Sequence, residues 1–136
     1  MEMSIALKNE SPVFREMPYI PEVHFGWLKN MMEHKRTCFL VDETEGELRG
    51  FFLGGLSTYY FNNDVFAEDY TIYVAPDYRG TRIGLRLIKA FEEWARNQGA
   101  KHCYLGTNTG IQSGRFVKLL QVLGYGGPGM MLSKEL

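Results

Sequence analysis

The order of the predicted elements indicates an α/β protein with a mixed, mostly antiparallel central sheet flanked by helices. Two helical segments near the N-terminus are followed by three strands joined by hairpin-type connections. A helix, a strand, a second helix and a last strand follow. A strand–helix–strand crossover places its second strand parallel to the first and beside it. With 136 residues, 45% of them hydrophobic, we expect one domain over residues 1–136.

The N-terminal segment leads into the first strand. We expect either a short strand or an irregular lead over residues 3–7, and a short helix over residues 10–17 that begins at Ser11-Pro12. A second helix is expected from Pro21 or Glu22. Apolar residues recur along one stripe of it at helical spacing: Val23, Trp27, Leu28 and Met31. Met31-Met32 could form a flexible ligand wall, and core packing is the favoured alternative.

The three middle strands are predicted from β-branched and aromatic runs. They cover residues 37–42, 48–56 and 65–74, with an acidic hairpin turn over residues 43–47. Gly54-Gly55 interrupts the second of these strands, which indicates a β-bulge or the close approach of another chain segment.

The C-terminal half alternates helices and strands. A helix is expected from about Thr81 to Asn97 with Gly99 as its C-cap, followed by a strand over residues 101–106. A helix over residues 113–123 ends at Gly124, and one last strand is expected from about Met130.

Composition and charge argue against several functional classes. The formal net charge of −1 gives no overall attraction to nucleic acid or to an anionic membrane, so neither partner is expected. Cys38 and Cys103 have no metal-ligand spacing, and no metal site is expected. No signal pattern and no apolar run of about 20 residues is seen, so a reduced, cytoplasmic protein is the expectation.

The turn between the third strand and the long helix carries the clearest chemical signal. It contains Gly80 and Gly84 together with Arg79 and Arg82. Glycines at a helix N-terminus let backbone N–H groups approach an anion closely, and the helix dipole and arginines add positive charge. The turn therefore indicates a phosphate-bearing ligand, although plain architecture is an equal alternative from these residues alone.

Residues 74–84, followed by Leu87-Ile88, resemble the acyl-CoA signature of the GNAT N-acetyltransferase superfamily. Gly99-Ala100 and residues 119–125 are similar to later segments of that family. The resemblance implies a splayed sheet that binds acetyl-CoA and a direct transfer of the acetyl group to an amine. The residues it implies for cofactor binding are Tyr73, Val74, Arg79, Gly80, Thr81, Arg82, Ile83, Gly84 and Ser113.

The chain departs from the family pattern at three positions. Arg82 stands where the signature has its middle glycine, and we expect its side chain to point outward. Leu120 stands where the family often has a Tyr that protonates the departing thiolate, and Ser113 stands where it has an Asn. The usual final hairpin is also shortened, which leaves a sheet edge that a second subunit could cover as a homodimer.

Direct transfer to an amine needs a general base and a donor for the oxyanion. Glu68 is the candidate base, because it lies six residues before Val74 on the same strand face as Tyr70 and Ile72, and because residues 66–68 resemble the base-bearing segment of the family's histone-acetylating branch. A solvated strand-end carboxylate is the alternative, and Asp69 is a second candidate on the other face. A backbone N–H near Tyr73 or Val74 would stabilise the oxyanion.

The proton donor to the thiolate stays open among Tyr104, Tyr125, Ser113 and solvent, and Arg115 and Lys118 could reach the cofactor from the last helix.

Two other functions remain open at this point. A non-catalytic acyl-CoA binder is consistent with Leu120 and Arg82, and an interaction protein that keeps only the fold would use the aromatic loop of residues 59–61. For an enzyme, the amine acceptor stays open among peptide N-termini, lysines, polyamines, aminoglycosides and amino acids.

Overall fold

The computed structural model describes residues 1–127, 129 and 131–136, and it confirms the predicted α/β class. The elements in chain order are α1 (Glu2–Glu10), α2 (Pro21–Glu33), β1 (Thr37–Thr44), β2 (Glu47–Thr58), β3 (Val65–Val74), the 3₁₀ helix η1 (Pro76–Tyr78), α3 (Ile83–Asn97), β4 (His102–Tyr104) and α4 (Ser113–Val122).

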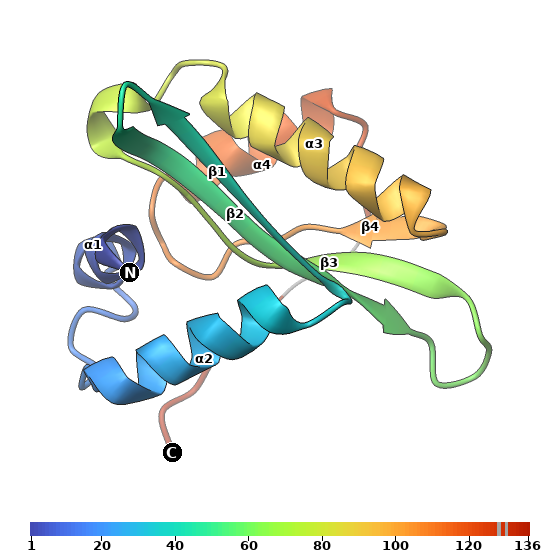
Figure 1. Cartoon of the computed structure of the whole chain (residues 1–136), viewed down its shortest axis with the longest axis horizontal. Helices are drawn as coiled ribbons and strands as arrows, with labels where there is room; N and C mark the ends of the chain where they lie inside the picture. Colours follow the sequence, from blue (N-terminus) through green and yellow to red (C-terminus); the bar gives the residue numbers. More distant parts are fainter. Residues whose placement is uncertain (128, 130) are drawn as a thin grey trace.

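The strands form one sheet in the order β1-β2-β3-β4. The β1–β2 and β2–β3 pairs are antiparallel, whereas β3 and β4 are parallel, as the crossover predicts. Helices α1 and α2 lie on one face of the sheet, and α3 and α4 lie on the other (Figure 1). The parallel pair is short, because only residues 66–68 of β3 face β4.

The main core lies between the sheet and α3. Phe52, Ile88 and Phe91 are fully buried there, and the rings of Phe52 and Phe91 are 4.3 Å apart. A smaller core on the opposite face joins Leu7 of α1 to Phe51 and Tyr73. The two cores fix β3 from both sides and hold its C-terminal half in place.

A β-bulge in β3 sits where the glycine pair predicts one. Leu53 pairs with Thr71 and Gly54 pairs with Asp69, so Tyr70 is the extra residue. Gly54 also permits a close approach, since a Cβ there would lie 2.6 Å from Cζ of Phe91. A bulge at the glycine pair is therefore confirmed, with its extra residue in β3, and a backbone group also approaches Gly54 closely, since the added Cβ would lie 2.7 Å from the carbonyl of Glu68.

The bulge changes which face of the sheet the neighbouring carboxylates occupy. Residues that pair directly across antiparallel strands share a face. Asp69 pairs with Gly54, whose position faces Phe91 of α3, so Asp69 lies on the α3 face. Glu68 pairs with Gly55 and lies on the α2 face. The expectation that Glu68 shares a face with Ile72 is wrong, because Ile72 packs in the core against α3.

The N-terminal residues form a helix, so the expected strand or irregular lead over residues 3–7 is wrong. Met3 and Leu7 are one helical turn apart and both pack against the smaller core. The alternation of Met3, Ile5 and Leu7 imitated a strand, but burial of the Met3–Leu7 stripe against Phe51 selects the helix.

The expected short helix over residues 10–17 is also absent, and these residues form turns after α1 ends. Ser11 is fully buried at this junction. Its hydroxyl donates to the carbonyl of Thr109 and accepts from the N–H groups of Val13 and Phe14, at 3.2 Å each. The serine thus ties the end of α1 to the loop before α4.

Helix α2 begins at Pro21 as predicted, but its apolar stripe does not pack in the core. Val23 is 66% exposed and Trp27 is 41% exposed, while Leu28 and Met31 are half-buried. The favoured core packing of Met31-Met32 is wrong for Met32, which is 63% exposed. The cause is that α2 packs mainly on β1 and leaves part of its apolar side uncovered.

The C-terminal end differs from the expected last strand. Met130, where that strand was to begin, lies outside the described residues, and residues 131–136 have no regular secondary structure. The strand expected over residues 101–106 is shorter, at His102–Tyr104.

Candidate functional site

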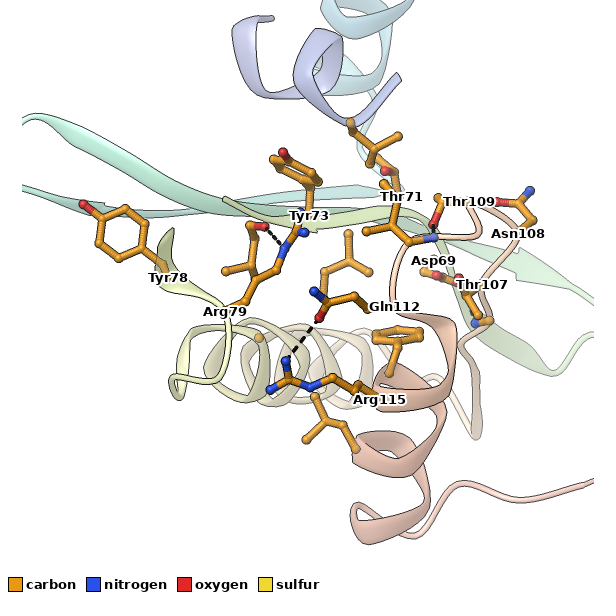
Figure 2. A pocket seen from close by; sticks show the side chains of 18 of the residues that line it. Asp69, Thr71, Tyr73, Tyr78, Arg79, Thr107, Asn108, Thr109, Gln112 and Arg115 are labelled. Carbon is orange, nitrogen blue, oxygen red and sulfur yellow. Dashed lines mark hydrogen bonds between the residues drawn. The ribbon is translucent and has the colours of Figure 1, made fainter. Parts of the chain in front are cut away.

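A cavity of about 550 Å³ opens where β3 and β4 part. Pairing stops at Glu68 and Tyr104, after which the chain beyond β4 turns away toward α4. The cavity is lined by residues 69–74 of β3, the turn before α3, the loop of residues 106–112 and one side of α4. Figure 2 shows these segments around the opening. Leu7, Phe14 and Trp27 line it from the α1 and α2 side.

The parted edge of β3 presents main-chain groups to this cavity. The N–H of Ala75 donates to the carbonyl of Arg49 at 2.9 Å, so this end of β3 points its odd-numbered main-chain groups toward β2. Main-chain direction alternates along a strand, and the groups of Ile72 and Val74 therefore point to the opposite edge. The β3 edge offers donors and acceptors of the kind that pair with an amide-containing chain.

The turn into α3 accommodates the arginine that departs from the family signature. Arg82 has φ −84° and ψ 5°, a conformation open to any residue, and its side chain is exposed. The left-handed position of the turn falls instead on Gly80, with φ +80°. Arg82 thus points outward as expected.

The N-terminus of α3 faces the cavity without a side-chain cap. The hydroxyl of Thr81 donates to the carbonyl of Tyr78 at 2.6 Å and receives only a long bond from the N–H of Ile83, at 3.4 Å. Gly84 and Leu85, in the first turn, line the cavity, and first-turn N–H groups have no intrahelical acceptor. These donors and the helix dipole suit a phosphate group.

Arg115 of α4 lies beside this helix N-terminus. A Cβ on Gly80 would be 3.4 Å from its Nη2, and its Nη1 donates to Oε1 of Gln112 at 3.3 Å (Figure 2). The guanidinium is exposed and makes no ion pair with any carboxylate in the described part of the chain. It is therefore free to bind an anion at the turn.

Arg79, by contrast, is already bound within the protein. Its Nη1 and Nη2 donate to the carboxylate of Glu10, the second at 2.7 Å, and its Nε donates to the carbonyl of Val74 at 2.9 Å. The guanidinium lies over the ring of Tyr73, whose hydroxyl donates to Glu10 at 3.0 Å. The bonds to Arg79 lower the pKa of Glu10. Arg79 lines the cavity, but its guanidinium is already hydrogen-bonded to groups of the protein.

Asp69 is the acidic residue that the structure brings into the cavity. Its Oδ1 accepts a hydrogen bond of 3.2 Å from the N–H of Gly106, across the point where the strands part. Burial raises its pKa to about 6, against the lowering effect of that hydrogen bond. A carboxylate with this pKa is ionised at neutral pH yet basic enough to accept a proton.

The sequence-predicted site residues divide into two groups. Tyr73, Val74, Arg79, Gly80, Thr81 and Gly84 line the cavity. The residues outside the lining are Glu68, Arg82, Ile83 and Ser113. Ile83 is buried in the core, and the carboxylate of Glu68 accepts a bond of 2.8 Å from Ser57 on the α2 face.

The tyrosines considered as proton donors lie away from the cavity lining. The hydroxyls of Tyr104 and Tyr59 share a hydrogen bond of 2.6 Å, and the hydroxyl of Tyr125 donates to Glu92 at 2.7 Å. Leu120 is buried in the main core. Solvent remains as the donor that the geometry leaves open.

Two kinds of feature are absent from the described residues. No helix among them combines the length and apolar character that crossing a membrane requires. Within the same residues, His, Cys, Asp and Glu do not gather in groups of three or more that could hold a metal ion.

Fold and site together define an α/β protein with an uncapped helix N-terminus beside two parted parallel strands. Residues 3–124 match the model of the Acetyltransferase (GNAT) family. The chain belongs to this family, as the sequence resemblance predicted.

Individual relatives agree with that assignment. Over 60 residues the chain is 42% identical to thialysine N-epsilon-acetyltransferase of Mus musculus, a match that covers 40% of this chain and 34% of that protein. The matched part is thus about a third of the relative's length.

Two solved structures share the fold at low identity. One is a transcriptional regulator from Bacillus halodurans C-125, with TM-score 0.84, 17% identity, and 99% and 92% of the two chains covered. The other is AAC(6')-Iy in complex with the bisubstrate analog CoA-S-monomethyl-acetylneamine, with TM-score 0.77, 16% identity, and 99% and 90% covered.

Proposed function

We propose that this protein is a single-domain, acetyl-CoA-dependent N-acetyltransferase that transfers the acetyl group directly to an amine. The observation that carries the proposal is the cavity between the parted strands, which has β3 main-chain groups that β4 does not pair along one wall and an uncapped helix N-terminus at one end. Family membership over residues 3–124 supports it. Both cysteines are free thiols, which suits the cytoplasm as its compartment.

The residues that line the cavity fit acetyl-CoA in three places. The first turn of α3, from Gly84, together with Arg115, would hold the pyrophosphate. The main-chain groups of Ile72 and Val74 would pair with the amide-containing arm. Bound in this way, acetyl-CoA supplies a thioester, the activated acyl group of the reaction.

Asp69 is the base that the geometry favours over Glu68. In the proposed step Asp69 accepts the proton that the amine loses, while the nitrogen forms a bond to the acyl carbon and the carbon–sulfur bond breaks. The thiolate then takes a proton from solvent. A main-chain N–H of the parted β3 edge close to Asp69 would donate to the acyl oxygen as negative charge develops on it.

The test is release of the CoA thiol from acetyl-CoA on addition of amines to the purified protein. Amine-dependent thiol release, with the acetylated amine confirmed by mass, is the expected result. Saturable acetyl-CoA binding without release for any amine would indicate a non-catalytic binder. Absence of binding at millimolar concentration would remove the acyl-CoA proposal and leave an interaction protein.

A further inference from the structure

The cavity has two chemically different ends, which determine from which side an acceptor can enter. The phosphate-binding features, Gly84 and Arg115, belong to α3 and α4 on one face of the sheet. A ligand held there passes between the parted strands toward the opposite face, where Leu7, Phe14 and Trp27 line the cavity. An amine acceptor therefore approaches from the α1 and α2 side.

The acceptor end is mainly aromatic. Phe14, Trp27 and Tyr70 line it, and Trp27 and Tyr70 remain 41% and 43% exposed. When an apolar ligand covers exposed aromatic surface at a concave mouth, apolar area is removed from water and binding is favoured. This surface also accounts for the failure of Trp27 to pack in the core: it faces the cavity.

One carboxylate lines the cavity, at the point where the strands part between its two ends. Among the described residues that line the cavity, Asp69 is the only acidic one. Two further carboxylates lie on the α1 and α2 face without lining the cavity, and both are already bonded: Glu10 to Arg79 and Tyr73, and Glu68 to Ser57. Each further ammonium of a polycation would enter this mouth without an anionic partner.

We infer that the acceptor is a primary amine with a single positive charge on an apolar or aromatic body, with Trp27 as the residue that selects it. This inference rests on the proposed function and narrows the amines left open by the sequence. Asp69 binds the ammonium and takes its proton, while the aromatic residues cover the body. Polyamines and aminoglycosides are poor acceptors on this account.

Three probe amines separate the contribution of the aromatic body from that of the positive charge. Phenethylamine has one charge and a ring, methylamine has one charge and no ring, and spermidine has several charges and no ring. Phenethylamine is expected to exceed both others in kcat/KM by about tenfold or more, the gain typical of covering one apolar group. In a calorimeter, phenethylamine is also expected to bind the CoA-saturated protein more tightly than spermidine does, a readout that needs no turnover.

Two substitutions on α2 provide a matched pair. Trp27→Ala should raise the KM for phenethylamine about tenfold and leave that for methylamine and for acetyl-CoA unchanged. Phe25→Ala, two residues away, is the control, because Phe25 is 58% exposed and does not line the cavity. Trp27→Phe should restore most of the selectivity.

The outcomes distinguish the inference from the proposed function. Preference for spermidine or an aminoglycoside, with acetyl-CoA binding intact, overturns the inference and leaves the N-acetyltransferase standing. Equal effects of Trp27→Ala and Phe25→Ala on phenethylamine binding also overturn it. If acetyl-CoA does not bind at all, the proposed function fails, and the inference fails with it.

Discussion

Arg79 and Glu10 form a two-pronged ion pair across 69 positions of sequence, with Nη2 2.7 Å from Oε2. The pair joins the end of α1 to the turn that leads into α3, and Tyr73 and the carbonyl of Val74 complete its bonding. The arginine that opens the family signature therefore fastens the N-terminal helix to the cavity wall. In the proposed site Arg79 would position the turn, and Arg115 would offer the charge that no ion pair engages in the described part of the chain.

Removing either partner of this pair should destabilise the fold. Glu10→Gln and Arg79→Ala are each expected to cost about 1–2 kcal/mol, since the pair is only partly buried, with side-chain exposures of 31% and 15%. Urea unfolding measures this cost. The double variant should lose less than the sum of the two, and strict additivity would show that the residues do not interact.

The same pair predicts a pH dependence of stability. Hydrogen bonding from Arg79 lowers the pKa of Glu10 below its ordinary value of 4.5. A lowered carboxyl pKa contributes stability that is complete above pH 4.5 and is lost as the pH falls through the folded-state pKa. The destabilisation caused by Glu10→Gln should thus shrink between pH 7 and pH 3. An unchanged difference over this range would contradict the assignment.

Arg115→Ala should weaken acetyl-CoA binding about three- to tenfold, because a charge-assisted phosphate contact is lost from an exposed site. The affinity for acetyl-pantetheine, which has no pyrophosphate, should not change. Lys118→Ala is the control, since Lys118 lies on α4 but not in the cavity lining. Equal weakening by both substitutions would mean that α4 contributes only diffuse positive charge.

Asp69→Asn should lower turnover by about 10²–10⁴-fold and leave acetyl-CoA affinity unchanged, because the amide cannot accept the proton. In the wild type, kcat/KM should rise with pH through an apparent pKa of about 6 and then level off, once the carboxylate is ionised. Two titratable groups interact with Asp69. Glu68 raises the pKa of Asp69, and Asp69 in turn raises the pKa of the Cys103 thiol. The pH–rate profile measures this ionisation.

Glu68→Gln is the matched control for that substitution. It should leave turnover nearly unchanged, since Glu68 bonds Ser57 on the other face of the sheet. Loss of activity in Glu68→Gln with retention in Asp69→Asn would restore Glu68 as the base that the sequence predicted.

Gly54→Ala tests the close approach at the bulge. An added Cβ would lie 2.6 Å from the ring of Phe91 and 2.7 Å from the carbonyl of Glu68, so a loss of about 1–3 kcal/mol is expected. Gly114→Ala in α4 is the control, because nothing lies within 4 Å of its added Cβ and alanine favours the helix. Thermal unfolding of both variants gives the comparison, and similar melting temperatures would contradict the packing described.

The sequence predicted elements well where pattern and packing agree. Strand β3 has the predicted bounds, 65–74, because its β-branched and aromatic run is long and ends at Pro76. Helix α1 was missed, because the alternation of Met3, Ile5 and Leu7 imitates a strand and only contact with Phe51 and Tyr73 favours the helix.

The site was predicted in part for similar reasons. The turn residues Gly80 and Gly84 could be placed from local signals alone. The choice between Glu68 and Asp69 as the candidate base depended on which strand carries the extra residue of the bulge. The glycines of β2 do not reveal that this residue is Tyr70 of β3. No local signal marks Glu10, whose role comes from a contact with a residue 69 positions away.

Titration of acetyl-CoA into the purified protein in a calorimeter tests the central claim most directly. The cavity between the parted strands predicts saturable one-site binding that CoA competes away and that Arg115→Ala weakens. Absence of measurable heat at millimolar acetyl-CoA, from protein shown to be folded, would contradict the acyl-CoA site.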